Sequence, residues 1–147
     1  MNFAPNHKVT VVLGATAVGT TSVNTSEINM ADYEGVVFVA LFGAVTDGSP
    51  GIKAQGGAQS NGSDAADFAA SDTADTAAAA SGQAVVLDVY RPLQQYVRGV
   101  ITRGGSTGAV IQGVIAIQYG SKAHPVVNDA TSIASTVLSV SPNFGTA

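Results

Sequence analysis

The sequence predicts an all-β domain, a two-sheet sandwich or jelly roll with extended terminal arms. Val, Ile and Thr together number 40 of the 147 residues, whereas Leu and Met together number seven, and β-branched residues favour strands over helices. Short stretches that alternate apolar and polar residues recur along the chain, with turn residues between them and no long helical pattern. The length fits one domain that spans residues 1–147.

Composition excludes several classes of protein. The chain has no Cys, so it carries neither a disulfide framework nor a thiolate metal site or nucleophile. Ten Asp and Glu outnumber six Lys and Arg, and without a basic run to neutralise phosphates we expect no nucleic-acid partner. The longest apolar run, residues 35–45, is about half of what a membrane-spanning helix needs, so we expect no membrane partner. Charged residues make up only 11% of the chain, which suggests that a partner covers much of its surface.

The first half of the chain yields two clear strands. Residues 8–13 alternate, and the glycines that follow bend or end that strand. Residues 20–25 can form a second, polar strand, and residues 26–32 are left open between extended chain and a helical turn. Residues 35–45 are apolar without alternation, which predicts a central strand covered on both faces, and the turn at 46–50 predicts a hairpin with residues 51–55.

Residues 56–82 are of low complexity, rich in Ala, Asp, Ser and Gly. Their one large apolar residue is Phe68, so we expect a long surface loop anchored there, with one edge strand, in preference to a short helix over 64–70. Asp64, Asp67, Asp72 and Asp75 could gather around Ca²⁺, but their spacing fits no EF-hand, and a solvated acidic loop is the favoured interpretation.

The second half predicts a strand over residues 84–90, which Pro92 ends, and then a hairpin. Its strands are residues 96–103 and 109–119, and its loop is 104–108. If Arg103 pairs with Ala109, then Ile101 faces Ile111 and Val97 faces Ile115, all on one apolar face.

The same register places Gly99 opposite Gly113, which leaves a thin spot on the core face. We expect a bulky side chain of the opposing sheet, Phe38 or Phe42, to fill it.

Two glycine-rich motifs have familiar functional counterparts. Residues 104–108 match the G-x-S-x-G pattern of a nucleophilic serine, Ser106, but a strand follows where that motif needs a helix. Residues 14–20 resemble a phosphate-binding loop without its lysine. We therefore expect both to be structural loops and the protein not to be an enzyme, with no cofactor and no metal site.

Polar and aromatic side chains on the later strands are candidates for contacts. Asp88, Arg91, Arg98 and Arg103 can pair within the sheet or reach a partner's carboxylates. The four tyrosines, Tyr33, Tyr90, Tyr96 and Tyr119, can form a sugar-stacking platform, although packing at the core edge is the favoured interpretation.

Three segments, YEGVVFVALFGAVTDG (33–48), LDVYRPLQQYVRGVITR (87–103) and IQYGSKAHP (117–125), resemble the capsid decoration, or cement, proteins of tailed bacteriophages. The resemblance implies a β-sandwich or jelly-roll virion subunit, usually a homotrimer, that binds the outer surface of the capsid. It would tie neighbouring copies of the major capsid protein together without catalysing a reaction. It also implies synthesis in the host cytoplasm and a final location on the virion.

On this interpretation the termini and several basic residues make the contacts. Residues 1–8 form an N-terminal arm and residues 120–147 a C-terminal arm on neighbouring subunits. The candidate partner-binding residues are Lys8, Arg91, Arg98, Arg103, Lys122 and His124. The alternatives are a receptor- or carbohydrate-binding β-module of a virion tail or fibre, and a small hydrolase that uses Ser106.

Overall fold

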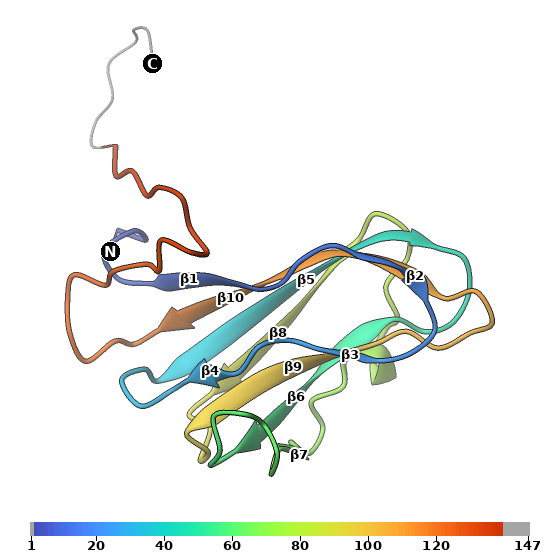
Figure 1. The fold of residues 1–147 in the computed structure, drawn as a ribbon, viewed down its shortest axis with the longest axis horizontal. Coiled ribbons are helices and arrows are strands. Elements are labelled where there is room, and N and C mark those ends of the chain that lie inside the picture. The colour runs from blue at the N-terminus through green and yellow to red at the C-terminus, as the bar shows by residue number, and fades with distance from the viewer. Residues whose placement is uncertain (1, 140–147) are drawn as a thin grey trace, which may run out of the picture.

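A computed structural model describes residues 2–139 as two antiparallel β-sheets packed face to face (Figure 1). Sheet A has the strand order β1-β10-β5-β8, and β2 also pairs with β10; sheet B has the order β3-β9-β6-β7, and β4 also pairs with β9. The all-β sandwich is thus confirmed. The elements are β1 (Lys8–Leu13), β2 (Thr16–Gly19), β3 (Val23–Asn24), β4 (Ile28–Asn29), β5 (Gly35–Val45), β6 (Gly51–Gly57), β7 (Ala66–Asp67), the 3-10 turn η1 (Thr73–Asp75), β8 (Ala84–Tyr90), β9 (Tyr96–Thr102) and β10 (Ala109–Tyr119).

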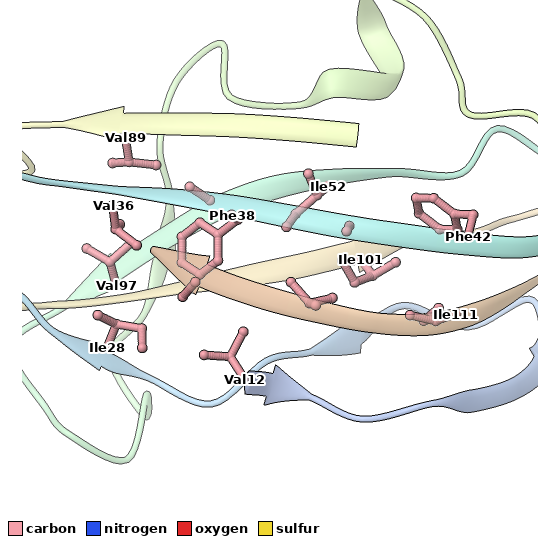
Figure 2. Packing of buried hydrophobic residues seen from close by; sticks show 14 of the residues in the cluster. Val12, Ile28, Val36, Phe38, Phe42, Ile52, Val89, Val97, Ile101 and Ile111 are labelled. Carbon is pink, nitrogen blue, oxygen red and sulfur yellow. The ribbon is translucent and has the colours of Figure 1, made fainter. Parts of the chain in front are cut away.

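The core lies between the two sheets and is built from alternate residues of each strand. In β5, Val36, Phe38, Ala40 and Phe42 are fully buried, and the residues between them are only half-buried. Ile52 of β6 and the inward residues of β9 and β10 meet these side chains from the other strands (Figure 2). β5 is therefore a central strand as predicted, but within residues 2–139 one of its faces is only partly covered.

The predicted hairpin of residues 35–45 and 51–55 is wrong. β5 pairs with β10 and β8 in sheet A, whereas β6 pairs with β9 and β7 in sheet B. The turn at 46–50 thus carries the chain across the core from one sheet to the other. Each strand still buries one apolar face. The alternation of apolar residues therefore fits two strands that face each other across the core as well as two strands that pair side by side.

The predicted hairpin of residues 96–103 and 109–119 is wrong for the same reason. In sheet B, Ile101 pairs with Ile52 and Val97 with Gly56; in sheet A, Ile111 pairs with Phe42 and Ile115 with Val39. Ile101 and Ile111 do share the core, but they approach it from opposite sheets (Figure 2).

Gly99 and Gly113 are consequently not neighbours. Gly99 pairs with Ala54 in sheet B and Gly113 with Leu41 in sheet A. Neither Phe38 nor Phe42 fills the space over Gly99. A β-carbon there would lie 2.8 Å from Cδ1 of Ile52, so the absence of a side chain makes room for that isoleucine.

Residues 56–82 form a long loop with one short edge strand, β7, as predicted. The Phe68 ring occupies the space that a side chain on Gly56 would need. The expectation of a single anchor is wrong, because Ala79 is also buried and its N–H donates to the Pro50 carbonyl (2.9 Å). The chain therefore holds this loop against the sandwich at two points, Phe68 and Ala79.

The described parts of the two predicted arms contact each other and β1. The Val126 N–H donates to the Pro5 carbonyl (2.9 Å). Asn128 Oδ1 accepts the Val9 N–H (2.7 Å), and Ser132 Oγ accepts the Val11 N–H (2.5 Å). Residues 124–132 thus run along the outer edge of β1; the end of the predicted C-terminal arm, 140–147, lies outside the described residues.

Candidate interaction surface

The outward side of sheet A is largely apolar, but it includes Asp88 of β8, which pairs with Val37. Because directly paired residues point to the same side of a sheet, the register places Val11, Ile115, Val39 and Val86 in one row across four strands. Val9, Ile117 and Val37 form the adjacent row, and Leu41 lies beyond. We call these eight side chains the outer face: Val9, Val11, Val37, Val39, Leu41, Val86, Ile115 and Ile117.

The outer face is partly exposed to solvent in the described chain. Val11 and Val86, at the two ends of its central row, are 46% and 60% exposed, and the other six side chains are half-buried. Sheet B packs on the opposite side of sheet A, so no strand within residues 2–139 covers this surface. An exposed, contiguous apolar surface of this kind marks an interaction site.

The corresponding side of sheet B is polar and engaged in internal contacts. Arg98 Nη1 lies 3.1 Å from Glu27 Oε1, and its Nε and Nη2 donate to Gln55 Oε1 at 2.9 and 2.7 Å. Lys53 Nζ lies 2.7 Å from Asp67 Oδ2. An outer sheet surface that faces water normally carries such groups, so the apolar surface of sheet A is the exception in this fold.

An aromatic cluster adjoins the outer face where β5 begins. The rings of Tyr90 and Tyr119 stack with centroids 6.5 Å apart, and the Arg91 guanidinium lies 5.1 Å from the Tyr90 centroid. The Tyr119 hydroxyl donates to Asp88 Oδ1 (2.7 Å), and Arg91 Nη2 lies 3.2 Å from Glu34 Oε1. Partial burial, reinforced by the Asp88 carboxylate, raises the pKa of Tyr119, so its hydroxyl stays protonated and a donor.

A cavity of about 330 Å³ lies beside this cluster, between the two terminal segments. The His7 ring stacks on Phe3 with centroids 4.4 Å apart, and His7 Nδ1 lies 3.1 Å from the Phe3 carbonyl oxygen. His124 Nδ1 lies 3.3 Å from the Pro5 carbonyl oxygen. The cavity is lined by Asn6, His7, Glu34, Tyr119, Gly120 and His124.

The structure separates the six residues singled out from the sequence into two groups. Arg98 makes the internal contacts described above, and Arg103 is 5% exposed and bonds only to main-chain carbonyls. Arg91 and His124 belong to the aromatic cluster and its cavity. Lys8 begins β1, and Lys122 Nζ donates to the Ala31 carbonyl (2.5 Å). Four of the six therefore lie at the two termini or in the aromatic cluster, and two hold the fold together.

The G-x-S-x-G loop binds a carboxylate of its own chain. Asp47 accepts hydrogen bonds from the Ser106 hydroxyl (2.6 Å) and from the N–H groups of Ser106, Thr107 and Gly108 (2.8, 2.9 and 2.5 Å). These donors, led by the hydroxyl, hold the pKa of Asp47 far below its usual range. The Asp47 bonds connect the loops 46–50 and 104–108, which both cross between the sheets. Both histidines lie beyond the opposite end of β5, so Ser106 has no histidine beside it to form a triad.

The other two motifs also have internal explanations. Gly19 lies under the Arg103 guanidinium, where a β-carbon would be 2.9 Å from Nη2, so the Gly14–Gly19 stretch accommodates an arginine of the same chain. In the acidic loop, Asp64 accepts the N–H groups of Ala58 and Gln59, and Asp72 caps η1. Within residues 2–139 no three His, Asp or Glu side chains converge on a metal site.

Sequence reasoning missed the outer face because it expected both faces of residues 35–45 to be covered and did not identify an exposed apolar surface. The available signal was the apolar run of residues 35–45, which lacks alternation. It indicated that both faces of the strand are covered but did not identify what covers them. The described residues contain no helix long and apolar enough to cross a membrane. Comparisons with protein-family models, curated proteins and solved structures found no match for this chain.

Proposed function

We propose that this protein is a non-catalytic assembly subunit, a capsid decoration protein that binds the outer surface of a viral shell as a homotrimer and cross-links neighbouring major capsid proteins. The observation that carries the proposal is the outer face, an apolar sheet surface beside a second sheet whose surface is polar. If both outer surfaces faced only water, both would be expected to carry polar residues. The apolar outer surface of sheet A therefore favours a protein partner on that sheet.

The physical role follows from mass action and multivalency. A subunit that binds only the assembled shell stabilises it, and several linked contacts per trimer act at high effective concentration, so each contact can be weak. The acidic chain, with a formal charge of −4, suits the outside of a shell better than its DNA-facing side. The aromatic cluster supplies polar contacts at the rim of the apolar surface.

The first test determines whether the chain is a virion component. Particles are purified from the source lysate and dissociated, and mass spectrometry gives the ratio of this chain to the most abundant shell protein. Hundreds of copies per particle support the proposal. Absence of the chain, or only a few copies, contradicts it.

The second test locates the contact. Particles stripped of this chain are incubated with purified wild-type protein, with Val39→Lys, or with Leu93→Lys, and bound protein is measured after sedimentation. Val39 is central in the outer face, whereas Leu93 is 99% exposed in the loop after β8 and serves as the matched control. We expect Val39→Lys to lower binding at least tenfold and Leu93→Lys to leave it unchanged. Equal binding by both variants contradicts the assignment of this surface.

A second candidate function rests on the aromatic cluster. Stacked tyrosines next to a cavity that presents Glu34 and His124 are suited to bind a sugar, as expected of a receptor-binding module on a tail or fibre. Glycan-array binding that is lost in Tyr90→Ala would favour this function. Absence of glycan binding by the wild-type protein would leave the decoration role.

A further inference from the structure

The free edge of sheet A at β8 is an unused strand-pairing site. The Arg91 N–H donates to the Glu34 carbonyl (2.7 Å), and the Phe42 N–H donates to the Gln83 carbonyl (3.0 Å). Odd-numbered residues of this strand therefore bond to β5, and the even-numbered residues Ala84, Val86, Asp88 and Tyr90 direct their N–H and C=O groups away from it. Within residues 2–139 no hydrogen bond reaches those outward groups.

Two other edges of the sandwich are closed by side chains. Asn128 and Ser132 accept the outward N–H groups at the edge of β1. On the exposed half of β6, Thr73 Oγ1 accepts the Ile52 N–H (2.9 Å) and Ser71 Oγ accepts the Ala54 N–H (3.1 Å). The fold thus protects these edges against foreign strands. At β8, Thr73, Thr76 and Ala77 lie beside Val85 and Val86, but within residues 2–139 they form no hydrogen bond to the outward N–H and C=O groups of the strand.

The sequence of β8 also lacks the features that block pairing. It contains no Pro and no Lys, and it pairs with β5 through seven consecutive residues without a bulge. Its one charged residue, Asp88, is bonded to the Tyr119 hydroxyl. Val86 and Tyr90 are 60% and 59% exposed, so an added strand would find apolar side chains beside it.

The same chain carries a segment suited to this edge. Residues 134–139 (ASTVLS) are rich in small and β-branched residues, and no charged residue occurs between positions 130 and 147. Val137 is 84% and Leu138 49% exposed, and the segment is in no strand of its own chain. It leaves the body on the β1 side and points away from the sandwich (Figure 1).

We propose that residues 134–139 of one copy pair with β8 of a neighbouring copy and extend its sheet A by one strand. The segment leaves its own sheet at the β1 edge, and β8 is the opposite edge of the same sheet. Donor and acceptor surfaces are therefore different, and such a head-to-tail contact closes into a ring when the rotation permits. The inference deepens the homotrimer of the proposed function by naming its contact, and it does not depend on shell binding.

The absence of Cys in the chain allows a direct test by disulfide trapping. Val86→Cys and Val137→Cys proteins are mixed in equal amounts under mild oxidation and examined on a non-reducing gel. Val18→Cys, on β2 and 50% exposed, replaces Val86→Cys in the matched control. We expect a linked dimer in the first mixture at a yield at least fivefold above the control, and covalent trimers from the protein that carries both Val86→Cys and Val137→Cys.

Each other result overturns the proposal and indicates a different occupant. Efficient dimers from Val86→Cys alone indicate pairing of β8 with itself across a two-fold axis. A linked monomer as the main product of the double variant indicates that the segment reaches its own β8. No dimer above the control indicates that the segment does not bind this edge.

A second measurement separates this contact from shell binding. Sedimentation equilibrium is performed on the full chain, on a chain that ends at Ile133, and on Val86→Lys and Val18→Lys. We expect trimers for the full chain and Val18→Lys and monomers for the other two, with each monomeric variant still unfolding in one cooperative thermal transition. A monomeric full chain, or a trimeric truncated chain, overturns the proposal. Val39→Lys should stay trimeric. If this variant loses shell binding while remaining a trimer, the loss is due to the outer face and not to the contact between copies at β8.

Discussion

Replacing Arg103 by Met should destabilise the fold more than any other single change of a charged residue in the described chain. Its guanidinium is 5% exposed and donates to three carbonyls, from Nε to Thr21 (2.8 Å) and from Nη1 to Ala17 (2.8 Å) and Ala109 (3.2 Å). These bonds connect β2 and the turn after it to the start of β10. Met fills a similar volume but leaves all three carbonyls without their donor.

The magnitude follows from the bonds lost and the solvation regained. A hydrogen bond from a charged donor contributes about 1.5–3 kcal/mol, so three contribute roughly 4.5–9 kcal/mol. Removing the guanidinium also removes its own desolvation cost, which is several kcal/mol, so we expect a net loss of about 4 kcal/mol. Unfolding entropy of about 2.1 cal/mol/K per residue, over 147 residues, converts this loss into a decrease of about 13 °C in the unfolding midpoint.

Urea and thermal unfolding of the purified variants measure this effect. Arg91→Met is the control, because Arg91 lies on the surface with an exposed ion pair, and its midpoint should not change. Arg103→Lys should fall between the wild type and Arg103→Met, because one ammonium group cannot reach three divergent carbonyls. An Arg103→Met midpoint within 3 °C of the wild type would refute the reasoning.

Three further predictions concern the loops. Gly108→Ala should destabilise the protein by more than about 2 kcal/mol in urea titrations, because Gly108 has φ +82° and its missing β-carbon leaves room for the Gly19 carbonyl. Gly14→Ala, where the space around the glycine is open, should leave the stability unchanged. Equal effects of the two substitutions would contradict this reasoning. The depressed pKa of Asp47 stabilises the folded state fully above about pH 4, and this stability is lost as the pH falls toward the pKa of Asp47 in the folded protein. Asp47→Asn should therefore make stability less dependent on pH in the acid range. An unchanged pH dependence would contradict the assignment. Phe68→Ala should speed proteolysis within residues 56–82 ahead of global unfolding, and an unchanged cleavage rate would show that the ring does not anchor the loop.

The sequence was sufficient to predict the longer strands, but it did not predict β2, which lies in the stretch expected to be a loop, or which strands pair. Alternation along 8–13 and 84–90 and the apolar run of 35–45 report burial, and burial is the same whether two consecutive strands share a sheet or face each other across the core. The loops at 46–50 and 104–108 are short enough for hairpins, yet both cross between sheets, and Asp47 bonds one to the other. That long-range bond, which has no local signature, distinguishes the observed topology from two hairpins.

The candidate surface was predictable in part for a related reason. The apolar run of β5 indicated that something covers both of its faces, and the low content of charge indicated a partner. Arginine chemistry alone could not separate Arg91, which is exposed, from Arg103, which is buried, because both lie at strand ends beside glycine or proline. Burial of an arginine depends on carbonyls that distant segments supply.

The position of β10 in sheet A determines when this protein can fold during its synthesis. β10 lies between β1 and β5, so both strands lack their main partner until residues 109–119 have left the ribosome. Folding is thus a late, cooperative event dominated by contacts distant in sequence, a topology typical of domains that fold in milliseconds to seconds. Until then the apolar run of β5 is exposed on both sides, and in this interval chaperones and neighbouring nascent chains can reach it.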